Sequence, residues 1–137
     1  MSRRTLILGT AGIIYFVALT LIGMWPTPVD HSFSSTIFDV TVWLRRQGAP
    51  QWISYNFIEF IANVLLFIPL GLLGDAWLRH RRPWRIVAFG VCLSIAIEIA
   101  QWLARPERFA TLADVIANTL GAALGVIIAQ LFRLLRR

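Results

Sequence analysis

The sequence predicts an all-α membrane protein with four transmembrane helices, and two features of its composition support this prediction. Of the 137 residues, 58% are hydrophobic and only 15% are charged, whereas a soluble domain usually carries about 25% charged residues. The apolar residues also gather into four runs, each close to the roughly 20 residues that a helix needs to cross a bilayer. We expect a single transmembrane domain over residues 1–137, without a sizeable soluble domain.

The four expected spans cover about residues 5–25, 53–77, 86–103 and 112–131. The first run follows MSRR and resembles the start of a signal peptide, but it is longer than the roughly 7–15 apolar residues of a cleavable one. We therefore interpret it as an uncleaved first helix. In the second run, Pro69 removes a backbone donor and Gly71 follows it, which predicts a bend in that helix.

The arginines predict the orientation of these spans, because basic residues collect on the cytoplasmic side of a membrane. All 13 basic residues are arginine. Nine of them flank the start of the first span, the connection between the second and third spans and the end of the chain, and four lie in the other connections. Both termini are therefore expected in the cytoplasm. The net charge of +6 follows from these clusters, and no nucleic-acid-binding pattern accompanies it.

Between the first two spans, the stretch TIFDVTVWLRRQG predicts a short amphipathic helix on the outer membrane surface. Thr36 and Asp39 fit a helix start, and Gly48 fits a helix end. Four apolar residues share one face of this helix: Phe33, Ile37, Val40 and Leu44. The alternation in IFDVTVWL leaves a strand as the alternative, although a lone strand at a membrane has no partner for its backbone.

Polar residues occur inside three of the apolar runs, where a charged side chain costs roughly 2.5–3.5 kcal/mol on insertion scales. Glu59 and Asn63 are four apart in the second run, and Asp114 and Asn118 are four apart in the fourth. In the third run, a stripe at helical spacing consists of Gly90, Ser94, Glu98, Gln101 and Arg105. Because successive spans alternate in direction, all three runs bring a carboxylate and an amide to one depth near the outer surface.

Two interpretations of these polar residues remain open. They form a binding site, in which Arg105 and Arg108 neutralise the carboxylates or hold an anionic head group, or they form a purely structural network between helices. Asp114 fits the structural interpretation in particular, because Thr111 and Asp114 make a capping-box pattern. In a catalytic version of the site, alone or around a metal ion, the working carboxylates would come from Glu59, Glu98 and Asp114.

Small residues recur at every fourth position of the fourth run, at Ala113, Ala117, Gly121, Gly125 and Ala129. Such a face lets another helix backbone approach closely, which predicts tight packing beside the face of Asp114 and Asn118. The single cysteine, Cys92, and the two histidines, His31 and His80, lack the spacing of a metal site. No metal site and no cofactor is expected from these residues.

Three motifs, in this order, resemble the VanZ-like family of small bacterial membrane proteins. They are NVLLFIPLGLLG, SIAIEIAQW and RFATLADVIANTLGAALG, and the resemblance covers about residues 59–125. The family pattern falls on Asn63, Phe67, Pro69, Gly71, Ser94, Glu98, Gln101, Arg108, Asp114, Asn118, Gly121 and Gly125. The family often has further acidic residues between the arginine and the aspartate. This chain has Thr111 and Ala113 there, which weakens the case for a metal held by clustered carboxylates.

The family takes its name from an accessory protein of glycopeptide-antibiotic resistance, linked to teicoplanin, so the resemblance implies a role at the cell envelope and a place in the bacterial inner membrane. We expect the chain to bind a lipid-linked envelope component, or a lipophilic or glycopeptide antibiotic. The predicted binding residues are Glu59, Asn63, Glu98, Gln101, Arg105, Arg108, Asp114 and Asn118. The alternatives are an intramembrane enzyme that uses Glu59 or Glu98 on a lipid-linked substrate, and a small lipid or drug transporter.

Overall fold

The computed structural model is all-helical across the residues that it describes, which are 2–23, 39–50, 52–78, 82–104 and 111–136. Four long helices make up most of it: α1 (Arg3–Gly23), α3 (Tyr55–Trp77), α4 (Pro83–Ala104) and α5 (Leu112–Leu135). Each is long and apolar enough to cross a membrane, so the chain is a multi-pass membrane protein. The four predicted spans are confirmed, with ends that differ by at most four residues.

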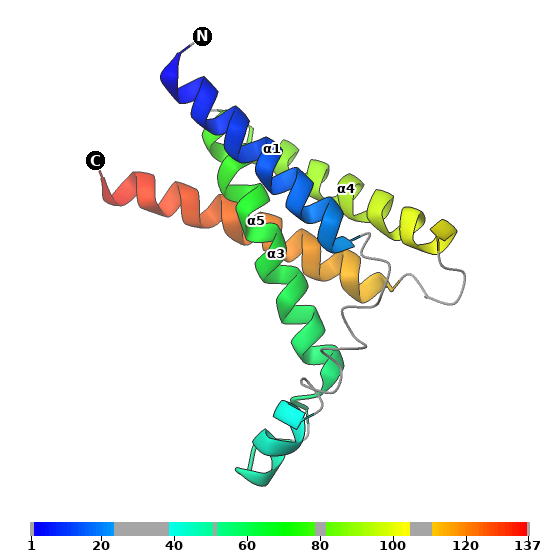
Figure 1. Ribbon diagram of the computed structural model, residues 1–137. Helices are drawn as coiled ribbons and strands as arrows, with labels where there is room; N and C mark the ends of the chain where they lie inside the picture. The colour runs from blue at the N-terminus through cyan, green and yellow to red at the C-terminus, as the bar shows by residue number, and fades with distance from the viewer. Residues whose placement is uncertain (1, 24–38, 51, 79–81, 105–110, 137) are drawn as a thin grey trace.

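Successive long helices run in alternating directions, so the two termini lie at the same end of the bundle (Figure 1). Helices α1 and α4 start at this end, and α3 and α5 finish there. This arrangement agrees with the predicted even number of spans. That this end faces the cytoplasm stays a prediction from the arginines.

Helices α3 and α5 make the most extensive contact in the bundle, and small residues allow their close approach. A Cβ atom at Gly121 or Gly125 of α5 would overlap with the backbone of α3. On α3, a Cβ atom at Gly71 would lie only 2.7 Å from the Cα atom of Gly125. The predicted small-residue face is confirmed through Ala117, which is completely buried, and these two glycines of α5.

Helix α1 is held more loosely than the other three. Between residues 3 and 22, only Leu19 is buried, and it joins a small core with Phe67, Leu70 and Ala122. The Tyr15 hydroxyl fixes the middle of the helix by donating a hydrogen bond to the carbonyl oxygen of Leu66 on α3, at 3.1 Å. One side of α1 therefore meets α3 and approaches α4, where the rings of Phe16 and Phe89 lie 6.2 Å apart, while the opposite side faces outward.

Helix α3 begins at a side-chain cap and continues as one helix through Pro69. The Ser54 hydroxyl accepts a hydrogen bond from the backbone N–H of Phe57 at 3.4 Å, which satisfies one of the donors left over at a helix start. Two residues beyond Pro69, Gly71 lies against α5. Gly71 therefore allows close contact between α3 and α5. The sequence predicted only a bend at this glycine.

Residues 39–46 are helical, which settles the choice between helix and strand for the described part of this stretch. The helix ends at residue 46, and Gly48, the predicted end signal, follows it with a φ of 86°. The backbone N–H of Ala49 donates to the carbonyl oxygen of Leu44 at 3.0 Å, as in a Schellman motif. The predicted contributions of Phe33, Thr36 and Ile37 lie outside the described residues, and the position of this helix on the outer surface stays a prediction.

Candidate functional site

Two side-chain hydrogen bonds join polar residues of three helices. Asn63 of α3 donates from Nδ2 to Oδ1 of Asp114 on α5, at 2.7 Å. Asn118, one turn further along α5, donates from Nδ2 to Oγ of Ser94 on α4, at 2.8 Å. The structure thus brings together four of the polar side chains that the sequence places at one depth.

The carboxylate of Asp114 has both oxygens engaged. Besides the bond from Asn63 at Oδ1, the Thr111 hydroxyl donates to Oδ2 at 2.5 Å. The Thr111 oxygen in turn accepts from the backbone N–H of Asp114 at 3.2 Å, so the predicted cap of α5 is present. Asp114 therefore stabilises the start of α5 and ties it to α3.

Glu98 lies one helical turn from Ser94 on α4 and is buried, with 8% of its surface exposed. It forms part of a groove of about 520 Å³ between α4 and α5. The other lining residues are Ile95, Ile99, Trp102, Thr111, Leu112 and Val115. Glu98 is the only carboxylate among these residues, and it lies in an otherwise mostly apolar wall.

Asn118 is the most deeply placed amide of the cluster. It is 5% exposed, and its Oδ1 atom accepts no hydrogen bond from the residues that the structure describes. Its only bond there is the one to Ser94, which is itself completely buried. A buried acceptor without a donor typically costs about 1–3 kcal/mol. Because Oδ1 already carries this cost, the bond from Nδ2 to Ser94 is the interaction that stabilises the buried Asn118 amide.

The remaining predicted site residues fall into two groups. Glu59 on α3 and Gln101 on α4 are half-buried. Both take part in interactions of their own, as does Glu98, so none of the three is an isolated polar group. Arg105 and Arg108 lie outside the described residues.

The positions of the carboxylates test the catalytic site built around a metal ion that the sequence left open. Within the described ranges, no group of three His, Cys, Asp or Glu side chains is placed to hold a metal ion. Glu59, Glu98 and Asp114 therefore do not form such a group.

Sequence reasoning missed one buried carboxylate, Asp75, which is 0% exposed near the end of α3. It lies three turns of helix beyond Asn63 along the chain, toward the end of the bundle that carries the termini. The signal was present in the sequence, because an acidic residue between LLG and AWL interrupts an apolar run in the same way as Glu98 does.

The fold and the polar cluster define a class: small multi-pass membrane proteins in which polar side chains join three of the long helices. The chain belongs to the VanZ/LLP1 family, whose family model matches residues 7–133, nearly the whole chain. The resemblance seen in the three motifs is thereby confirmed. No curated protein and no solved structure matches the chain.

Proposed function

We propose that this protein binds a lipid-linked envelope component, or a lipophilic or glycopeptide antibiotic, in the groove between α4 and α5. One observation carries the proposal: the buried carboxylate of Glu98 forms part of the wall of this groove. Its volume of about 520 Å³ falls within the range of roughly 300–1,000 Å³ that is typical of small-molecule sites. A carboxylate at such a place in a membrane helix is expected to be functional.

The lining of the groove matches an amphipathic ligand. Ile99 and Trp102 are 51% and 56% exposed, so the groove opens at the side of the bundle, where lipid surrounds the protein. An apolar tail fits against these side chains. The Glu98 carboxylate, which accepts hydrogen bonds, fits hydroxyl or amide groups of a head group, as sugars and peptides provide them.

The positions of the two carboxylates support a division of roles between them. Asp114 uses both oxygens within the protein, so it serves to hold α5 against α3. Glu98 is the carboxylate that lines the groove. Membership of the VanZ/LLP1 family supports the envelope as the place of action, because the family name derives from glycopeptide resistance.

Blocking the groove tests this proposal. Ile99→Trp adds a bulky ring to the groove lining, whereas Leu103→Trp adds the same ring to a 70% exposed position of α4 outside the lining. The purified variants in lipid nanodiscs are exposed to a photoactivatable polyprenyl-linked cell-wall precursor and, separately, to photoactivatable teicoplanin. For at least one probe, we expect Ile99→Trp to lower the labelling affinity about tenfold, which corresponds to about 1.4 kcal/mol, and Leu103→Trp to leave it unchanged.

The same experiment separates the competing functions. Equal labelling of both variants and the wild type would contradict binding in this groove. A cleaved or transferred product that the wild type and Leu103→Trp form from the precursor, but Ile99→Trp does not, would show that the groove is catalytic, with Glu98 as the first candidate for a general base.

A further inference from the structure

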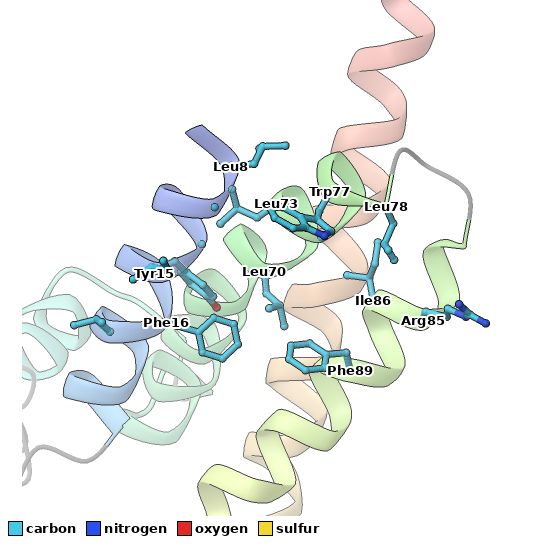
Figure 2. Close-up of a pocket in the computed structure, with 15 residues that line it drawn as sticks. Leu8, Tyr15, Phe16, Leu70, Leu73, Trp77, Leu78, Arg85, Ile86 and Phe89 are labelled. Atoms are coloured by element: carbon cyan, nitrogen blue, oxygen red, sulfur yellow. The ribbon is translucent and has the colours of Figure 1, made fainter. Parts of the chain in front are cut away.

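A second and larger groove lies between α1, α3 and α4 (Figure 2). It has a volume of about 730 Å³ and shares none of its described lining residues with the groove at Glu98. Its walls are apolar almost throughout, with Leu70, Leu73 and Ile86 on one side of the view and residues of α1 facing them. The function proposed above does not use this groove.

The groove is deep at Gly12 of α1, because this residue has no side chain to fill it. A Cβ atom at Gly12 would meet no atom of the described residues within 4 Å, so there is open space in front of it. By contrast, a Cβ atom at Gly74 on α3 would lie 2.7 Å from a methyl carbon of Ile86 on α4. Helices α3 and α4 therefore close the groove on one side, and α1 leaves it open on the other.

A small polar recess adjoins one end of this groove. It has a volume of about 70 Å³, and Leu8 and Trp77 line both the recess and the groove. Its polar lining consists of Ser2, Arg4 and Thr5. Arg4 donates from Nη2 to the carbonyl oxygen of Ala76 at 3.1 Å, and because a guanidinium has five N–H donors, others remain for a second acceptor.

Arg85 provides a second positive charge at the same end of the bundle. Its side chain lines the groove, while its guanidinium points away from the apolar wall formed by Ile86 and Phe89 (Figure 2). The guanidinium carbon lies 5.5 Å from the centroid of the Trp84 ring. Arg4 and Arg85 stand near the starts of α1 and α4, which are at the same end of the bundle as the chain termini (Figure 1).

We propose that this groove binds an anionic glycerophospholipid from the leaflet at the arginine end, with an acyl chain in the groove and the phosphate at Arg4, while the charge of Arg85 adds to the attraction from the same end of the bundle. The order of chemistries along the site matches that of the lipid, from a long apolar groove to a polar recess that contains Arg4. Arginine suits this role because its planar fork binds phosphate oxygens through two parallel hydrogen bonds. Indole rings such as that of Trp77 are also common at the depth of lipid head groups.

A second copy of the chain, docked through α1, is the competing occupant. Copies in one membrane share their orientation, so a symmetric contact through this groove would bring two sets of Arg4 and Arg85 to the same membrane surface. Like charges brought together oppose association, whereas the phosphate of an anionic lipid neutralises them. Charge complementarity therefore favours the lipid.

Two pairs of variants separate the apolar and the charged part of the site. Gly12→Leu fills the groove from α1, where space is open, and Ala18→Leu adds the same side chain to an exposed position of α1 outside the lining. The double variant Arg4→Gln and Arg85→Gln removes both charges of the site. Its control, Arg133→Gln and Arg136→Gln, removes two charges at the end of α5, a helix that contributes no described residue to the groove lining.

The measurement is native mass spectrometry of delipidated protein titrated with phosphatidylglycerol or phosphatidylcholine. We expect wild-type protein and both controls to prefer phosphatidylglycerol. Each arginine near an anionic lipid contributes about a factor of five to affinity, so the Arg4 and Arg85 double variant should bind phosphatidylglycerol roughly 25-fold more weakly. Gly12→Leu should lose binding of both lipids at this site.

Three results would overturn the proposal: no preference in the wild type, unchanged affinity in Gly12→Leu, or equal effects of the two arginine double variants. A wild-type dimer that Gly12→Leu converts to a monomer would assign the groove to a second copy instead.

Discussion

At the scale of single residues, Asn118 and Ser94 form a buried hydrogen-bonded pair that joins α5 to α4. Both are buried, and they bond to each other at 2.8 Å. Ser94→Ala keeps the size of the side chain but leaves the Asn118 amide without its partner. We expect a loss of about 1–3 kcal/mol in the free energy of unfolding, measured by steric trapping in bicelles.

A double-mutant cycle provides the control for this prediction. Replacing both partners, with Ser94→Ala and Asn118→Leu, removes the polar groups together and should recover most of the loss. Asn63→Ala should cost less, about 0.6–1.7 kcal/mol, as is usual for a bond between membrane helices. A Ser94→Ala protein as stable as the wild type would contradict the structural importance of this pair.

Residue identities could be predicted from the sequence better than their pairing. The capping of α5 by Thr111 follows from local spacing, and the structure confirms it. The bond from Asn63 to Asp114 spans 51 positions of the chain and depends on how α3 and α5 are rotated about their axes, which local spacing does not determine. Asp75 was missed although the rule that marks Glu98 applies to it equally.

At the scale of helices, glycines in different surroundings have opposite roles. Gly125 lies against the backbone of α3, and Gly12 faces open space. We expect Gly125→Ala to separate α3 from α5 and to cost about 1–3 kcal/mol, as overpacking does. Gly12→Ala serves as the matched control and should cause no loss. Thermal unfolding in detergent checks both, and equal stability of the two variants would contradict the close contact between α3 and α5.

The position and type of the helices could be predicted from the sequence, but their partners only in part. Apolar runs of bilayer length determine where a membrane helix forms, so all four spans were found. The small face of α5 predicted a close contact without naming the partner helix. The contact of Gly71 with α5 shows that the partner helix is α3. The sequence did not reveal this role of Gly71, because a glycine two residues after Pro69 is equally typical of a bend.

At the scale of the whole molecule, the orientation of the bundle is the prediction with the widest consequence, since it decides which leaflet each groove meets. Cysteines introduced at Gln47 and Arg82, in a background where the exposed Cys92 is alanine, report it. In spheroplasts, we expect a membrane-impermeant maleimide to label position 47 at once and position 82 only after permeabilisation. The reverse pattern would place the arginine end outside and the groove at Glu98 in the inner leaflet.

The central claim is that Glu98 serves a ligand in the groove between α4 and α5, and Glu98→Gln tests it most directly. Glutamine keeps the shape and removes the charge, and a neutral amide is easier to bury than a carboxylate. If Glu98 served only a structural ion pair, its loss would strand a buried partner and cost about 3–5 kcal/mol of stability.

The decisive measurement combines the melting temperature of Glu98→Gln with its affinity for the polyprenyl-linked precursor and for teicoplanin, on the same preparation. We predict an unchanged melting temperature together with at least a tenfold loss of affinity for the ligand that the wild type binds, because a hydrogen bond to a charged group contributes about 1.5–3 kcal/mol. A Glu98→Gln protein that is stable and binds this ligand as tightly as the wild type would contradict the account.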